Sequence, residues 1–246
     1  DKIHQKIAEK SFNRFTIVAN DTHYFRHLGL DVPPATNYFS EIAPNKWFIP
    51  NCVDTNFFIR NDGIPSLKNK KIILVPRQIT PDRGIDLAIK SFALFHQYYP
   101  EYYLYIIGPK REPAYYELCC SLIKQFNIDK NAVWIDFVKN EDMISYYSTA
   151  QLTLIPTLRR EGTSLSALES MSCGTVTVST NVAGLLDLPT VQGEPSPDSL
   201  SQAILEALKK RDYYSKLQQT KVHEIFNQKN WSNAWLNVIK SMDNKT

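Results

Sequence analysis

The chain has 246 residues, of which 43% are hydrophobic, 22% charged and 12% aromatic, and its formal net charge is +3. This ordinary globular composition excludes intrinsically disordered, collagen-like and low-complexity proteins. The charges form no basic blocks, so nucleic-acid binding through a basic face is not expected. The longest apolar runs have about five residues, whereas a membrane-spanning helix needs roughly 18, so no transmembrane segment is expected.

The cysteines indicate neither a zinc site nor a disulfide framework, because no two of them are spaced as C-x-x-C. They are Cys52, Cys119, Cys120 and Cys173. The first residues also lack the apolar segment of a signal peptide, so we expect reduced thiols and a cytoplasmic location. His23 and His27 are spaced four apart, which suits a metal pair, but no third ligand accompanies them and no metal site is expected.

The first quarter of the chain predicts short elements without a regular alternation. We expect a helix over 1–12, a strand over 15–19, a helix over 22–28, a loop over 31–45 and a strand over 46–49. Asp21 is a suitable N-cap for the second of these helices, and Gly29 ends it. The stretch 51–67 is irregular and is the best candidate for a linker between domains.

From Lys70 onward, strands and helices alternate regularly. Buried strands are predicted over 71–75, 103–107, 132–137, 152–155 and 175–179. Helices are predicted over 80–95, 113–126, 140–149, 164–173 and 198–209, with further helical segments between 213 and 240. This alternation is typical of an α/β fold, a Rossmann-like parallel sheet with helices on both faces. The tyrosine pairs 115–116, 146–147 and 213–214 are expected on half-buried helix faces.

In such sheets, ligands bind beyond the carboxyl ends of the strands, and two loops there carry notable side chains. The first loop, 76–84, holds Arg77 at the strand tip and Arg83 in the first turn of the next helix. Two guanidiniums at a helix N-terminus can clamp a diphosphate. The alternative is two solvated surface arginines, one of them paired with Asp82 or Asp86.

The second loop, 157–164, leads from a strand into a helix that ends at Gly174. Glu161 precedes this helix and Glu169 follows eight residues later, so both carboxylates can reach one ligand lying along the first turns. Carboxylates accept hydrogen bonds from sugar hydroxyls, and the free amides between them can hold a phosphate. Taken alone this spacing is weak, because it also fits a surface glutamate and an unrelated loop carboxylate.

Taken together, the two loops resemble those of the retaining GT-B glycosyltransferases of family 4, the glycosyl transferases group 1. That family is marked by E-x7-E before a helix that ends in Gly, which matches Glu161, Glu169 and Gly174. Its G-R-x5-K-G phosphate loop is similar to the stretch from Arg77 to Gly84, in which Pro76 replaces the first Gly and Arg83 replaces Lys. Further segments with a resemblance are 51–58, 134–138, 180–185 and 230–232, so that the likeness covers roughly residues 47–240.

The resemblance implies a role for each matching position. Arg77 and Arg83 would neutralise the departing diphosphate, and Glu161 would contact the donor sugar, which makes these three the expected catalytic residues. The expected donor-binding residues are Glu169 on the ribose hydroxyls, Gly162, Thr163, Ser164 and Leu165 beside the phosphates, and Phe137 and Val138 beside the base. No D-x-D motif occurs, so no metal and no cofactor are expected besides the UDP-, GDP- or dTDP-linked sugar itself.

Three further positions depart from the family pattern in ways that affect the site. Thr163 and Ser164 replace the common Phe-Gly and add two hydroxyls near the phosphates, and Asp187 stands where the family often has Glu. Of the eight glycines, Gly84, Gly162, Gly174 and Gly184 are expected in or beside the site.

The resemblance also implies how the chain is divided. Residues 1–50 would be the tail of an N-terminal acceptor domain, 51–68 a linker, 69–225 the donor-binding domain and 226–246 a C-terminal crossover helix. The chain then looks like a truncated enzyme or one half of a split one. Its expected partners are the missing N-terminal domain or a companion subunit, and a glycan or lipid-linked acceptor. Any peripheral contact with the inner face of the membrane would lie in the absent domain.

Two classes of function follow from these residues. The first is a retaining transferase that uses a nucleotide sugar in bacterial polysaccharide or glycoconjugate synthesis and turns over poorly as this chain alone. The second is a non-catalytic module, a fragment or subunit that only binds the nucleotide sugar. A related epimerase or phosphorylase is disfavoured by the E-x7-E loop.

Overall fold

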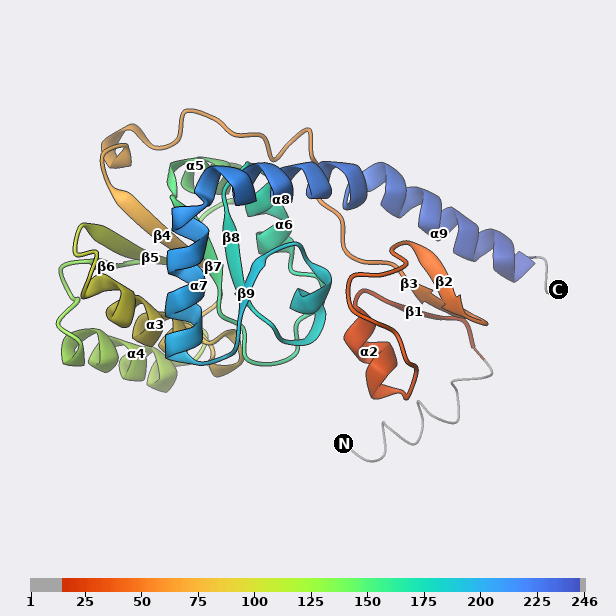
Figure 1. Cartoon of the computed structure of the whole chain (residues 1–246), viewed down its shortest axis with the longest axis horizontal. Helices are drawn as coiled ribbons and strands as arrows, with labels where there is room; N and C mark the ends of the chain where they lie inside the picture. The colour runs from red at the N-terminus through yellow and green to blue at the C-terminus, as the bar shows by residue number, and fades with distance from the viewer. Residues whose placement is uncertain (1–14, 244–246) are drawn as a thin grey trace.

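Two sheets of different size form the molecule, and a long helical tail joins them (Figure 1). The computed structural model describes residues 15–243, so the helix expected over 1–12 lies outside the described residues. The larger lobe contains a six-stranded sheet and the smaller lobe a three-stranded sheet. None of the helices in the described part of the chain is long and apolar enough to cross a membrane.

The six-stranded sheet confirms the predicted α/β class. Its strands are β4 (Lys71–Pro76), β5 (Tyr102–Ile107), β6 (Ala132–Ile135), β7 (Leu152–Ile155), β8 (Thr177–Thr180) and β9 (Val191–Gly193). They lie in the order β6-β5-β4-β7-β8-β9, and every neighbouring pair is parallel. This is the strand order of a Rossmann-like sheet, in which the chain reverses its direction of winding between β4 and β7.

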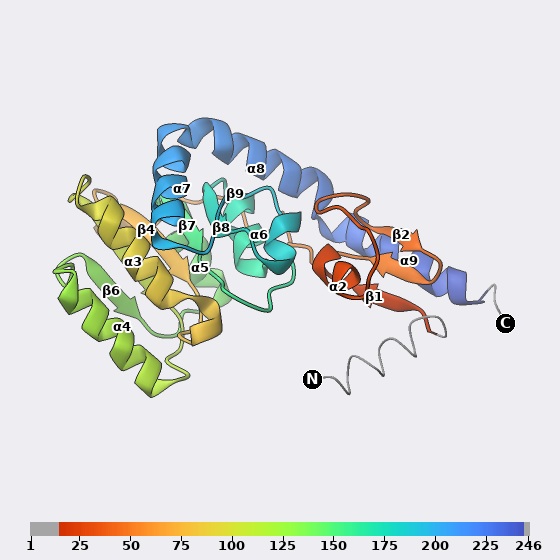
Figure 2. The ribbon, with the colours of Figure 1, turned by 60° about the horizontal axis from the view of Figure 1, so that its bottom comes forward.

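Helices cover both faces of this sheet, because successive residues of each strand point to opposite sides. The helices are α3 (Ile85–His96), α4 (Pro113–Gln125), α5 (Asn140–Thr149), α6 (Leu165–Ser172), α7 (Pro197–Lys209) and α8 (Arg211–Ile225). Ile73 of β4 lies in the core formed with α3, α4 and α7, whereas its neighbour Leu74 lies in the core formed with α5, α6 and α8. Figure 2 shows α3 and α4 on one side of the sheet.

Several element boundaries differ from the sequence prediction, and each difference has a local cause. The helix predicted over 80–95 is broken, since the short 3₁₀ helix η2 (Pro81–Arg83) ends at the left-handed Gly84 and α3 starts only at Ile85. The strand predicted over 132–137 ends at Ile135. Strand β9 was missed because Val191–Gly193 is too short to give a pattern.

The smaller lobe is built from N-terminal strands and the C-terminal helix. Its elements are β1 (Ile17–Ala19), α2 (Thr22–His27), β2 (Ser40–Ala43), β3 (Lys46–Phe48) and α9 (Gln228–Asp243). Strand β2 corrects the loop predicted over 31–45, and it pairs antiparallel with β3. Helix α9 packs Ala234 and Val238 against Trp47 and Ile49, so the tail of the chain covers one face of the N-terminal sheet.

Buried polar contacts join the two lobes. Asp187, in the 3₁₀ helix η3 (Ala183–Asp187), is fully buried and accepts hydrogen bonds from the backbone N–H and the hydroxyl of Thr22 at 2.7 and 2.6 Å. It also accepts one from the N–H of Ala35 at 2.9 Å, and its own carbonyl accepts one from the hydroxyl of Tyr38 at 2.6 Å. These contacts hold the N-terminal lobe over the carboxyl ends of the neighbouring strands.

Candidate functional site

The loops that follow β4 and β7 meet at the point where the sheet reverses its winding. This is the place where Rossmann-like sheets bind their ligands, because the two loops diverge there and leave a crevice. Arg77 directly follows β4, and Glu161 lies in the loop between β7 and α6. The structure therefore brings the two predicted loops together at one edge of the sheet.

Two arginines converge on a single carboxylate oxygen at this edge. Nη2 of Arg77 donates a hydrogen bond to Oε2 of Glu161 at 2.5 Å, and Nη1 of Arg83 donates to the same oxygen. The hydroxyl of Thr157 accepts a second hydrogen bond from Nη2 of Arg77 at 2.6 Å. All three predicted catalytic residues are thus in one cluster, which carries two positive charges and one negative charge.

This cluster is largely shielded from solvent. The side chains of Arg77 and Glu161 are 8% and 9% exposed, and that of Arg83 is 31% exposed. Burial lowers the pKa of Arg77, and the nearby Glu161 carboxylate opposes that shift. The alternative of two solvated arginines is therefore wrong for Arg77, and Asp86 pairs with Lys90 at 2.9 Å rather than with either arginine.

Glycines allow the loops to approach closely enough for this contact. Gly84 has a φ of +67°, and a Cβ at this position would lie 2.0 Å from the carbonyl oxygen of Pro156. The turn that carries Arg83 can therefore pack directly on the loop that follows β7. A Cβ on Gly184 would lie 2.4 Å from the backbone of Gly162, so η3 also packs tightly on that loop.

The second glutamate of the motif lies in an adjoining cavity. Glu169 lines a cavity of about 320 Å³ together with Arg77, Phe137, Val138 and Leu165. Its Oε2 accepts a hydrogen bond of 2.8 Å from the hydroxyl of Tyr147. Burial raises the pKa of Glu169, while the Tyr147 hydrogen bond and the charge of Arg77 pull the pKa down. Glu169 is therefore not the surface residue that its spacing alone allowed.

The other predicted donor-binding residues differ in exposure and in hydrogen bonding. Phe137 is 75% exposed, because β6 ends before it and leaves it in the loop at the mouth of the cavity. The hydroxyl of Thr163 accepts a hydrogen bond from the N–H of Asn51 at 2.7 Å and donates one to the carbonyl of Asn20 at 3.0 Å. This hydroxyl is thus engaged with the N-terminal lobe. Ser164 precedes α6, and its buried Oγ has no hydrogen-bond partner among residues 15–243.

Two further side chains complete the site and were not found from the sequence. Thr157 is buried and links Arg77 to the loop after β7. It escaped prediction because a threonine that follows a strand has no distinctive pattern in the sequence. Tyr147 was expected to be half-buried, but it is only 1% exposed. Its position on the same face of α5 as Met143, four residues earlier, could have indicated that it points inward.

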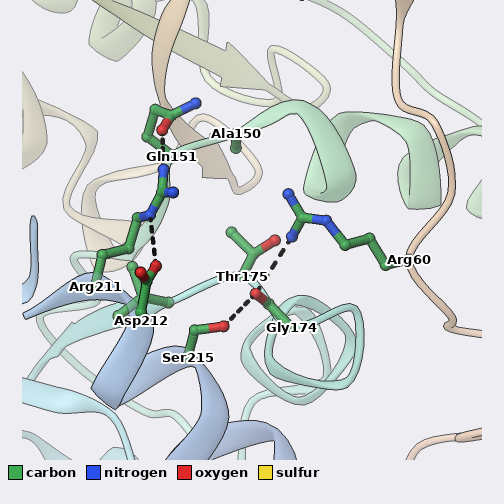
Figure 3. Close-up of a pocket in the computed structure, with 9 residues that line it drawn as sticks. Arg60, Ala150, Gln151, Gly174, Thr175, Arg211, Asp212 and Ser215 are labelled. Atoms are coloured by element: carbon green, nitrogen blue, oxygen red, sulfur yellow. Dashed lines mark hydrogen bonds and ion pairs between the residues drawn. The ribbon is translucent and has the colours of Figure 1, made fainter.

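A second pocket with two arginines lies at the opposite, amino-terminal end of the strands (Figure 3). Here Arg60 donates hydrogen bonds to the carbonyls of Ser148 at 2.9 Å and Gly174 at 3.3 Å. Arg211 bonds the side-chain oxygen of Gln151. Gly174 was expected near the catalytic residues, but it ends α6 and therefore lies in this distant pocket.

The described residues contain no group of three or more His, Cys, Asp or Glu side chains that could hold a metal ion. The expectation that the site works without a metal stays a prediction. What the arrangement offers chemically is a pair of cations for an anionic group, next to a cavity that has a carboxylate on its wall.

Known proteins resemble this chain in sequence and in fold. The chain is 27% identical over 130 residues to the serotype-specific mannosyltransferase WbdA of Escherichia coli, a match that covers 50% of this chain and 16% of WbdA. The chain thus spans only a small part of that relative. Among solved structures, a glycosyltransferase of Rickettsia africae aligns with a TM-score of 0.81 and 16% identity, covering 100% of this chain and 68% of that one.

Anabaena Alr3699/HepE, solved in complex with UDP and glucose, aligns with a TM-score of 0.78 and 15% identity, over 99% of this chain and 68% of that one. At such identities these structures establish the fold, which is that of the GT-B glycosyltransferases. The family model described as glycosyl transferases group 1 matches residues 59–222, which is well over half of the chain. The chain therefore belongs to the glycosyl transferases group 1.

Proposed function

We propose that this chain is the donor-binding part of a retaining glycosyltransferase of family 4, which transfers a sugar from a nucleotide sugar to a glycan or lipid-linked acceptor. The observation that carries the proposal is the convergence of Arg77 and Arg83 on one oxygen at the switch point of the sheet. Two buried or half-buried guanidiniums at that place form an anion site, since among the described residues Glu161 is the one carboxylate that pairs with them.

The diphosphate of the donor would replace the Glu161 carboxylate between the arginines. A diphosphate carries more charge than one carboxylate, so it neutralises the pair more completely. Two buried donors, Nε of Arg77 and Oγ of Ser164, have no partner in the described part of the chain and are available for further hydrogen bonds to the diphosphate. Glu161, released from the arginines, would then be free to accept hydrogen bonds from hydroxyls of the donor sugar.

The nucleoside would occupy the adjoining cavity. Glu169 supplies a hydrogen-bond acceptor for ribose hydroxyls, and the exposed ring of Phe137 lies in the loop where the base would bind. The cavity volume of about 320 Å³ is in the range of small-ligand pockets. The UDP and glucose bound by Anabaena Alr3699/HepE, which shares this fold, support the assignment.

In the transfer, the bond from the anomeric carbon to the leaving phosphate oxygen breaks and a bond to the acceptor hydroxyl oxygen forms on the same face. The acceptor proton passes to an oxygen of the leaving diphosphate. Negative charge grows on that diphosphate as the bond breaks, so Arg77 and Arg83 stabilise the transition state more than the bound donor.

The acceptor and the biological role follow only from relatives. WbdA is named as a serotype-specific mannosyltransferase, which supports a role in bacterial polysaccharide or glycoconjugate synthesis and makes mannose-containing donors the first to test. Because the chain covers 16% of WbdA, the acceptor is expected to need residues outside this chain.

Calorimetric titration with UDP, GDP and dTDP tests the proposal. We expect one of them to bind with a dissociation constant in the micromolar range, and the corresponding nucleotide sugar to compete with it. A transfer assay then separates the two classes of function, since binding without transfer in the presence of a complete acceptor domain would indicate a non-catalytic module. Absence of binding by all three nucleotides would contradict the proposal.

A further inference from the structure

The hydroxyl of Tyr147 meets the carboxylate of Glu169 at the wall of the cavity. Tyr147 lies on α5 and Glu169 on α6, and the distance from the phenol oxygen to Oε2 is 2.8 Å. Within residues 15–243 no other side chain forms a hydrogen bond or ion pair with this carboxylate. One carboxylate oxygen is therefore held in place, while Oε1 keeps its capacity to accept a hydrogen bond.

Tyr147 itself is held firmly. Its side chain is 1% exposed, its ring packs edge-on against Phe58 at a centroid distance of 6.5 Å, and its carbonyl accepts a hydrogen bond of 2.6 Å from Thr175. A buried phenol needs a hydrogen-bond acceptor; Glu169 accepts from this one, and the hydroxyl of Ser166 also lies beside it. Burial also raises the pKa of Tyr147 well above its ordinary value, so the phenol remains a donor at physiological pH.

A carboxylate on a flexible glutamate side chain would lose rotamer freedom when it bound a ligand hydroxyl. A hydrogen bond that already fixes the carboxylate removes part of this cost before the ligand arrives. Fixed orientation also makes the site selective. A ligand that lacks the hydroxyl leaves the buried carboxylate oxygen of Glu169 without a hydrogen-bond donor, and this lowers the ligand's affinity.

We propose that Tyr147 is a positioning residue that holds Glu169 so that the site selects ribonucleotides over 2′-deoxyribonucleotides. The inference rests on the proposed function, since it assumes that a nucleoside diphosphate occupies the cavity. It narrows that function, because it favours UDP or GDP over dTDP as the nucleotide of the donor.

The test compares each ribonucleoside diphosphate with its 2′-deoxy counterpart, UDP with dUDP and GDP with dGDP, by calorimetry. For the pair whose ribo form binds, we expect the wild-type chain to prefer the ribo form by about tenfold or more. Tyr147→Phe keeps the ring and removes the hydroxyl, so the preference should fall to about threefold or less with little change in affinity for the deoxy form. Tyr146→Phe, on the neighbouring tyrosine, is the matched control and should keep the wild-type ratio.

The outcomes separate the inference from the proposed function. If the wild-type chain binds no nucleotide, the proposed function fails and the inference fails with it. If nucleotides bind but dTDP and dUDP bind as tightly as UDP, or Tyr147→Phe keeps the wild-type preference, only the inference is overturned. A purely structural role for Tyr147 would weaken the ribo and deoxy forms equally and leave their ratio unchanged, which also overturns it.

Should Tyr147→Phe fail to fold, 3-fluorotyrosine placed at position 147 preserves the ring and the hydroxyl. Fluorine makes the phenol a stronger donor and so alters the hydrogen bond that holds Glu169, and we therefore expect the preference for the ribo form to change. An unchanged preference in that variant would overturn the inference.

Discussion

The two arginine pairs at opposite ends of the strands look alike in composition but differ in what they bind. Arg77 and Arg83 share one carboxylate oxygen, which sits in a loop. Arg60 and Arg211 bond backbone carbonyls and a side-chain amide, and Arg211 also lies 3.6 Å from the carboxylate of its exposed neighbour Asp212. The anion of a ligand can take the place of the Glu161 carboxylate between the arginines. The backbone carbonyls bonded by Arg60 are fixed at the ends of helices and cannot be displaced in this way. We therefore propose that arginines serve ligand binding at one end of the sheet, whereas at the other end they bond carbonyls at the ends of helices.

The largest effect that the comparison predicts is on nucleotide affinity. Arg77→Ala removes the most buried cation of the candidate site and leaves Glu161 with Arg83 alone, so we expect nucleoside diphosphate affinity to fall by about 100-fold or more. Arg211→Ala is the matched control at the other end of the sheet and should change affinity by less than about twofold. Calorimetry measures both, with thermal melting to verify folding. Equal losses in the two variants would break the comparison.

The next effect concerns the exchangeable anion. Glu161→Gln removes the carboxylate that competes with the diphosphate, so we expect nucleoside diphosphates to bind about tenfold more tightly. Transfer should nevertheless decrease by about 100-fold or more, because the donor sugar loses its carboxylate contact. Calorimetry measures the dissociation constant of the nucleoside diphosphate, and a transfer assay on the same preparation measures the rate of sugar transfer. Weaker nucleotide binding in Glu161→Gln would show that the carboxylate supports the anion site instead of competing for it.

A smaller effect is expected on stability at the opposite pocket. Arg60→Ala removes hydrogen bonds to the carbonyls of Ser148 and Gly174, and we expect the free energy of unfolding to fall by about 1 kcal/mol. Nucleotide affinity should not change. Lys68→Ala is a suitable control, because Lys68 belongs to the same segment and its side chain is exposed. Denaturant unfolding measures the difference, and a loss of nucleotide binding in Arg60→Ala would contradict the structural assignment of this pocket.

The smallest effect is a pH dependence of stability that involves Glu169. Burial raises the pKa of Glu169 above its ordinary value of 4.5, so the folded chain binds this proton more tightly than the unfolded chain does. The stabilisation from the protonated form is complete below pH 4.5 and is lost as the pH rises through the raised pKa. Glu169→Gln lacks this dependence, so its free energy of unfolding should increase relative to wild type over that range. Denaturant unfolding of both proteins at several pH values measures this. If the free energy of unfolding of Glu169→Gln fell relative to that of wild type as the pH rose, the raised pKa of Glu169 would be contradicted.

The sequence was sufficient for the parallel sheet because each of its longer strands is a short apolar run followed by a helical pattern. Strands β2 and β9 escaped prediction, since Ser40–Ala43 is half-buried without alternation and Val191–Gly193 has only three residues. Gly84 was recognised as part of the phosphate loop, but its left-handed conformation, which separates η2 from α3, depends on contact with Pro156. Such a tertiary contact leaves no periodic signal in the sequence.

For the site, the sequence identified which residues belong together but not how they are paired. Arg77, Arg83 and Glu161 were predicted to surround a donor, yet their ion pairs with one another arise only when the loops after β4 and β7 meet. Thr163 was predicted beside the phosphates, and its hydroxyl instead bonds Asn51 and Asn20, because the N-terminal lobe packs on this loop. Contacts between lobes therefore decide which polar groups remain available to a ligand.

The central claim is that the arginine pair at the carboxyl ends of the strands holds the donor diphosphate by exchanging it for Glu161. A crystal structure of the chain with the nucleoside diphosphate that binds in calorimetry tests this most directly. We expect phosphate oxygens within hydrogen-bond distance of both Arg77 and Arg83, with the Glu161 carboxylate displaced from them. A diphosphate bound elsewhere, as between Arg60 and Arg211, or a Glu161 carboxylate that still bonds both of its arginines, would contradict it.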